Sequence, residues 1–148
     1  MGRISDWISS LLSKSSTDLS KSSTDSASEL QSEAEHGNAE TQYCLAWDYD
    51  THGHSTEAVR WYRKAADQGV ANAQYELGYH YFTGLGVPQN YILAHMWFNL
   101  AASSEYMIRP DQQKEAVGKR DLVASKMTPA QLAEAQKLAR EWKPKKEN

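Results

Sequence analysis

The chain has 148 residues, enough for one domain and an appended segment, with 16 lysines and arginines against 19 aspartates and glutamates. The resulting net charge of −3 excludes the basic field of a protein that binds nucleic acid or other polyanions nonspecifically. The single cysteine, Cys44, excludes an intramolecular disulfide framework and a cysteine-based zinc site.

Hydropathy limits the class of protein further. The apolar runs cover only a few residues each, which is too short for a transmembrane segment. Serines interrupt residues 1–14, where a signal peptide needs a continuous apolar core. Because a single cysteine suits a reducing compartment, we expect a cytoplasmic protein.

Residues 1–32 are predicted to be a serine-rich, largely disordered N-terminal segment with one short amphipathic helix. The helix is predicted because apolar residues recur at i, i+3, i+4 and i+7, namely Ile4, Trp7, Ile8 and Leu11. Residues 12–18 are then repeated letter for letter as residues 19–25, and their serines and threonines compete with helix formation by bonding their own backbone. This composition predicts a flexible linker.

The apolar stripe of this helix has several roles open to it. The helix could fray as part of a disordered terminus. It could instead fold back on the rest of the chain, as a cap or in a groove, or it could anchor the chain on a membrane surface. Arg3 and Lys14 supply little positive charge for the membrane role.

From residue 33 onward, aromatic residues recur at regular spacing among helix formers. Residues 39–51 align with residues 71–83 at a shift of 32, and residues 58–66 align with residues 94–102 at a shift of 36. Each unit reads as two helices, and a longer inter-helix loop in the second unit accounts for the difference between the shifts. Self-similarity at this period predicts an all-α fold, an α/α solenoid with two repeats over residues 33–105.

Two glycines have predicted roles in these repeats. Gly69 stands between two helical patterns, where a left-handed residue ends a helix. Gly78 lies inside a helix, where glycine costs about 1 kcal/mol against alanine, so another helix is expected to cross closely there. Leu77, Tyr81 and Trp97 are expected to fill the core around it.

The repeats resemble Sel-one-like repeats, which are solenoid relatives of the tetratricopeptide repeats. The second unit carries the motif at Ala73, Leu77, Gly78, Tyr81, Gly84, Gly86, Val87, Ala94, Trp97, Phe98, Ala101 and Ala102, with Asn90 where aspartate is usual. The first unit keeps Leu45, Tyr49, Ala58, Trp61, Tyr62, Ala65, Ala66 and Gly69, but it has Thr41 and Ala46 where the motif favours alanine and glycine, and it lacks the Gly-x-Gly-Val loop. The resemblance implies a scaffold for protein partners.

Residues 106–143 are predicted to form a capping helix pair that acts as a third unit, followed by a tail over residues 144–148. The first helix covers residues 111–127. The second begins with Thr128 as N-cap, Pro129 at the first helical position and Gln131 three residues after the cap.

Motifs with a catalytic mechanism are absent from the sequence. There is no G-x-S-x-G, S-x-x-K or phosphate-binding G-x-x-x-x-G-K, so no catalytic residue and no cofactor site is predicted. His52 and His54 flank Gly53 in a loop, where they are either solvated turn residues or ligands that share a metal with His36 or Asp50. Without a spaced third ligand, we predict no metal site.

A surface is the stronger functional candidate. In a tetratricopeptide-like arrangement the first helix of each unit lines the concave face, and eight residues at equivalent positions share that side: Glu40, Tyr43, Trp47, Asp50, Asn72, Tyr75, Tyr79 and Phe82. Aromatic rings edged by polar groups suit a peptide groove. The alternative is that several of these residues pack between adjacent units.

The function predicted from these observations is that of a non-catalytic adaptor, which binds a peptide or partner protein on its concave helical face. Two rivals remain open. One is a hydrolase of the β-lactamase-like kind attributed to some disulfide-rich relatives, although a nucleophile with a paired base is missing here. The other is a membrane-surface regulator that acts through the N-terminal amphipathic helix.

Overall fold

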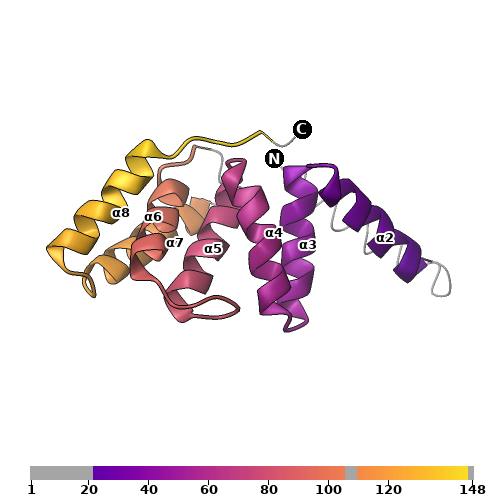
Figure 1. Cartoon of the computed structure of the whole chain (residues 1–148), viewed down its shortest axis with the longest axis horizontal. Helices are drawn as coiled ribbons and strands as arrows, with labels where there is room; N and C mark the ends of the chain where they lie inside the picture. The colour runs from indigo at the N-terminus through magenta and orange to yellow at the C-terminus, as the bar shows by residue number, and fades with distance from the viewer. Residues whose placement is uncertain (1–21, 106–109, 147–148) are drawn as a thin grey trace.

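The computed structural model describes residues 22–105 and 110–146, and the predicted amphipathic helix near the N-terminus lies outside them. The described residues form seven α-helices without a strand. Figure 1 shows α2, α3, α4 and α5 following one another along the molecule, then α6 and α7, which overlap in this view, and α8 at the far end. The helices are α2 (Ser22–Glu35), α3 (Ala39–Thr51), α4 (Ser55–Asp67), α5 (Ala71–Thr83), α6 (Tyr91–Ala102), α7 (Pro110–Ala124) and α8 (Pro129–Glu141). None of them is long and apolar enough to cross a membrane.

Two helix pairs form the centre of the molecule, and they confirm the predicted all-α solenoid. Helices α3 and α4 pack together, α5 and α6 pack together, and α4 packs against α5 to join the two units. Gly69 has φ of 96° at the joint, as the prediction of a left-handed helix end requires. Gly84 and Gly86 also have positive φ, in the loop between α5 and α6.

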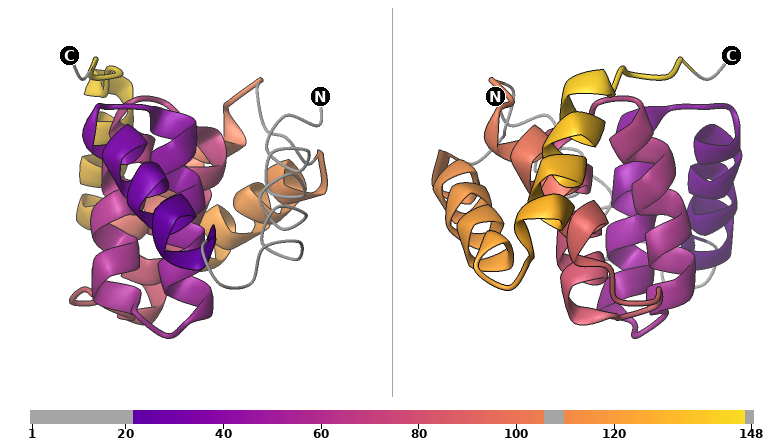
Figure 2. Two further views of the ribbon diagram at one scale, coloured as in Figure 1. Left: turned by 90° about the vertical axis from the view of Figure 1, so that its right-hand side faces the viewer. Right: turned by 60° about the vertical axis from the view of Figure 1, so that its left-hand side comes forward.

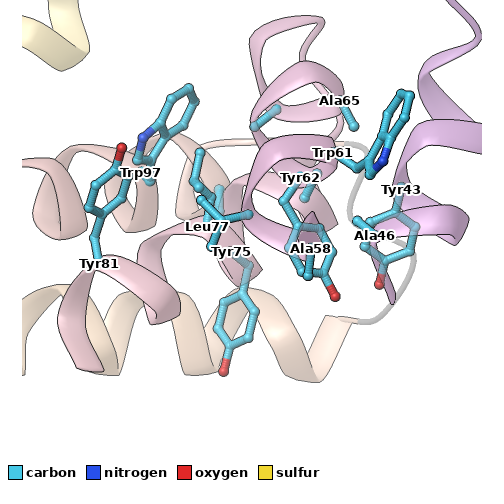
Figure 3. Close-up of a cluster of buried hydrophobic side chains, with 14 of the residues drawn as sticks. Tyr43, Ala46, Ala58, Trp61, Tyr62, Ala65, Tyr75, Leu77, Tyr81 and Trp97 are labelled. Carbon is cyan, nitrogen blue, oxygen red and sulfur yellow. The ribbon is translucent and has the colours of Figure 1, made fainter. Parts of the chain in front are cut away.

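The close approach predicted at Gly78 is made by α6. A Cβ atom built on Gly78 would lie 2.9 Å from the ring of Phe98, so only a glycine lets the two helices meet at this distance. Leu77 and Phe98 are fully buried, and Tyr81 and Trp97 are nearly so. Together with Tyr62 they belong to the continuous core of both units, part of which is shown in Figure 3.

Helix α2 differs from the flexible linker predicted up to residue 32. It packs against α3 (Figure 2), where Ala34 is fully buried and its carbonyl accepts a hydrogen bond of 3.0 Å from Gln42 Nε2. One repeat later, Gln74 Nε2 donates to the Ala66 carbonyl over 3.2 Å. Because both pairs are related by the shift of 32, α2 occupies the place of a second helix from a preceding unit. Packing on α3 offsets the low helix propensity of its serines.

Helices α7 and α8 both take their main contacts from α6. The glutamine contact recurs here, since Gln113 Nε2 on α7 donates to the Ala102 carbonyl at the end of α6 over 3.0 Å. Helix α7 thus packs against α6 as a first helix packs against the preceding unit, but α7 and α8 do not pack together as α3 and α4 do, in contrast to the predicted helix pair. The start of α8 is as predicted: Thr128 and Gln131 form a reciprocal capping box, with Pro129 as the first residue of the helix.

The segment after α8 runs back along the solenoid. The rings of Trp142 and Trp97 lie 6.3 Å apart at their centroids, edge to face. Further on, the Lys145 backbone N–H donates to the Asp67 carbonyl over 2.7 Å at the end of α4. The C-terminal segment therefore contacts both central units, a path that its sequence does not indicate.

A buried histidine makes stability depend on pH. His95 on α6 is 3% exposed, its Nδ1 has no hydrogen-bond partner, and burial, with Arg120 nearby, lowers its pKa. The unfolded chain therefore binds a proton more readily than the folded chain as pH falls through about 6.5. We expect wild type to lose up to about 1.4 kcal/mol of stability per pH unit below that value, relative to His95→Phe.

Urea unfolding of both proteins between pH 7.5 and 5 measures this difference. Parallel pH profiles for the two proteins would show that His95 does not carry the effect.

Candidate functional site

The first helices of the two units, α3 and α5, and helix α7 meet on one side of the molecule. Asp50 Oδ2 of α3 lies 3.2 Å from His80 Nε2 of α5. The Tyr75 hydroxyl of α5 donates to Glu115 Oε2 of α7 over 3.0 Å. We call the surface on this side the first-helix face, defined by Glu40, Trp47, Asp50, Glu76, Tyr79, Glu115 and Lys119. It corresponds to the concave side in the predicted arrangement.

Two aromatic rings are exposed on this face. Trp47 is 45% exposed and Tyr79 is 37% exposed, although large aromatic residues favour burial. They occupy equivalent positions in the two units, because they are 32 residues apart. The Nζ atom of Lys119 lies 5.8 Å from the centroid of the Tyr79 ring, which is within the range of a cation–π contact.

The other predicted aromatic residues pack between helices. The Tyr43 ring lies 5.9 Å from that of Tyr62, and the Tyr75 ring lies 5.7 Å from that of Phe98. Both Tyr43 and Tyr75 are buried, as is Asn72. Phe82 is partly buried and its ring lies 5.9 Å from the Tyr91 ring. Of the five aromatic residues predicted for this surface, only Trp47 and Tyr79 are exposed.

Asp50 connects the face to the interior. Its Oδ2 accepts from His80 Nε2 over 3.2 Å and from the Tyr62 hydroxyl over 3.5 Å. The fully buried His80 also directs Nδ1 to the Leu85 carbonyl at 2.9 Å. Both ring nitrogens thus lie within hydrogen-bond distance of an oxygen atom. This network holds Asp50 in position and joins the two units.

Carboxylates dominate the electrostatics of the face. Burial, with Glu115 and Glu76 nearby, raises the pKa of Tyr75, and burial, with Glu76 and Asp50 nearby, raises the pKa of Tyr62. Both phenols therefore stay protonated at neutral pH. The nearby acids belong to α3, α5 and α7, so the face carries negative charge along its length.

The cysteine and two of the histidines considered as nucleophile or metal ligands are buried or lie close to backbone carbonyl groups. Burial, with a smaller effect of Glu40, raises the pKa of the Cys44 thiol to about 12, which makes it a poor nucleophile. His52 Nδ1 lies 2.7 Å from the Asp48 carbonyl, and His36 Nδ1 lies 2.6 Å from the Ser32 carbonyl. Across residues 22–105 and 110–146, no group of three histidine, cysteine, aspartate or glutamate residues is placed to hold a metal ion.

Glu115 and Lys119 were missed in the prediction from sequence. They are four residues apart on α7, so they share a helix face, but the lapse of the repeat motif after residue 105 hides their register. The recurring glutamine, Gln113, is the signal that identifies α7 as a first helix.

Comparison with known proteins agrees with this architecture. The family model described as Sel1 repeat matches residues 55–70 and 71–106. Among solved structures, the chain is similar to a protective antigen present in uropathogenic Escherichia coli strains and displaying an SLR fold, with 28% sequence identity and a TM-score of 0.67. The similarity covers 78% of this chain and 24% of that one, so this chain spans about a quarter of the antigen's length.

Proposed function

We propose that this Sel1-like repeat helical protein is a non-catalytic interaction module whose first-helix face binds a peptide or partner protein. The Sel1 repeat fold is in general a protein-interaction module, which supports the proposal. The observation that carries it is the exposure of Trp47 and Tyr79 at equivalent positions of the two units. Rigid aromatic rings with polar edges are the residues that most often dominate binding energy at protein interfaces.

The non-catalytic part of the proposal is supported by the chemistry of the described residues. Cys44 is buried with a raised pKa, and the imidazole of His80 is occupied on both nitrogens by structural contacts. A single buried thiol also supports a place in the cytoplasm.

Affinity capture from the native cell tests the proposed face. We expect wild type to retain a partner that the double variant Trp47→Ala, Tyr79→Ala loses, with affinity reduced at least about tenfold because each ring contributes on the order of 1–2 kcal/mol. Leu85→Ala is the matched control, since Leu85 is 48% exposed but lies in the α5–α6 loop, outside the face. Circular dichroism confirms that each variant is folded. A partner retained by the double variant would show that binding occurs elsewhere.

A further inference from the structure

The first-helix face and helix α4 present different sets of charged side chains. The first-helix face carries four carboxylates, from Glu40, Asp50, Glu76 and Glu115, and one ammonium group, from Lys119. The outer face of α4 instead presents Arg60, Arg63 and Lys64, which lie over the rings of Trp61 and Tyr81. A partner of the first-helix face therefore meets a negative surface, although the net charge of the chain is only −3.

The molecule already places one of its own cations on this face. Lys119 lies over the Tyr79 ring, as described above. Trp47 is the equivalent residue of the first unit, is more exposed, and has no aromatic or cationic group over its ring among the described residues. The first unit thus presents an open counterpart of the occupied second position.

Carboxylates stand on either side of Trp47 along α3. Glu40 is exposed two turns before it, and Asp50 is half-buried about one turn after it. The contacts of Asp50 with His80 and Tyr62 both use Oδ2, which leaves Oδ1 outside these two hydrogen bonds. A carboxylate therefore lies on each side of Trp47 on the same helix, about one turn away at Asp50 and about two turns away at Glu40.

We infer that the partner is a protein segment that carries an arginine, whose guanidinium group stacks on Trp47 and pairs with the carboxylate of Asp50 or Glu40. This rests on the proposed function of the face and specifies the chemistry of its partner. Arginine fits better than lysine, because its planar group stacks on an aromatic ring and donates hydrogen bonds in its own plane at the same time. Tryptophan is also the aromatic residue that attracts cations most strongly.

The probe for this inference is a random dodecapeptide library displayed on phage. It is selected against the full chain and counter-selected against Trp47→Ala, and the enriched sequence is synthesised with a fluorescent label. We expect enrichment of arginine. Replacement of that arginine by citrulline, which has nearly the same shape without the charge, should weaken binding to wild type by about tenfold or more, and replacement by lysine should weaken it less.

Matched variants of the protein locate the contact. Either Glu40→Gln or Asp50→Asn, according to which carboxylate pairs with the arginine, should weaken the arginine peptide severalfold and leave the citrulline peptide unchanged. Glu57→Gln makes the same chemical change at an exposed position of α4 and should have no effect on either peptide. Fluorescence anisotropy gives all of these affinities.

The outcomes separate the two proposals. If selected peptides need Trp47 but bind equally well with citrulline, the inferred partner chemistry is wrong and the proposed face stands. If selected peptides bind Trp47→Ala as tightly as wild type, or if no peptide is enriched over the variant, the inferred partner chemistry is wrong, and the proposed face is then decided by the affinity capture described above.

Discussion

Tyr62→Ala is expected to lower the free energy of unfolding by about 3 to 5 kcal/mol, which is typical of large-to-small changes at buried aromatic residues. Tyr62 is fully buried on α4, where its ring lies 5.9 Å from that of Tyr43 on α3 and 5.7 Å from that of His80 on α5. Alanine would leave a cavity between the two units and remove contacts to both. Urea unfolding followed by circular dichroism measures the loss.

Tyr62→Phe is the matched control for this change. It keeps the ring and removes only the 3.5 Å hydrogen bond to Asp50, so it should cost about 1 kcal/mol or less. Equal losses for the two variants would mean that the hydroxyl, and not the ring, holds the units together.

Gly86→Ala is expected to cost about 2 to 5 kcal/mol, because two effects combine at this position. Gly86 has φ of 71°, a conformation that disfavours any residue with a side chain. In addition, a Cβ atom there would overlap the carbonyl group of Ser55 and lie 2.8 Å from the Thr56 nitrogen, both at the start of α4. Backbone atoms cannot move aside as a flexible side chain does, so the loop must shift.

Gly53→Ala separates these two effects. Gly53 also has positive φ, 80°, but no atom lies within 4 Å of the position that a Cβ atom would take, so alanine should cost only about 1 to 2 kcal/mol. Thermal and urea unfolding of both variants give the comparison. Equal losses would show that the α5–α6 loop does not press on α4 as described.

Both positions bear on the proposed function. Tyr62 and Gly86 lie where the first unit meets the second. The Asp50–His80 contact, which joins α3 to α5 on the first-helix face, lies beside them. A shift between the units would change the spacing of Trp47 and Tyr79. We therefore attribute any loss of partner binding in these variants to altered geometry, whereas Trp47→Ala keeps the core intact.

The candidate site was predicted only in part from the sequence. Trp47, Tyr79, Glu40 and Asp50 were selected by helical spacing, but spacing cannot separate a ring at the centre of an exposed face from one turned toward the next helix. Tyr43 and Tyr75 lie one helical turn before Trp47 and Tyr79 on the same side of their helices, but at that turn their rings contact those of Tyr62 and Phe98. Glu115 and Lys119 come from a helix whose repeat register is not visible in its residues.

The sequence by itself determined the local features of this protein. Its repeats, the left-handed Gly69, the capping box at Thr128 and the close approach at Gly78 each follow from backbone conformation or side-chain volume, which act between neighbouring residues or adjacent helices. Only the tertiary structure decided the rest. Helix α2 forms in a serine-rich segment, where it packs against α3 and buries Ala34, and the segment around Lys145 returns to α4. Such long-range packing outweighs local propensity, because burial of a helix face contributes more free energy than the preferences of its individual residues.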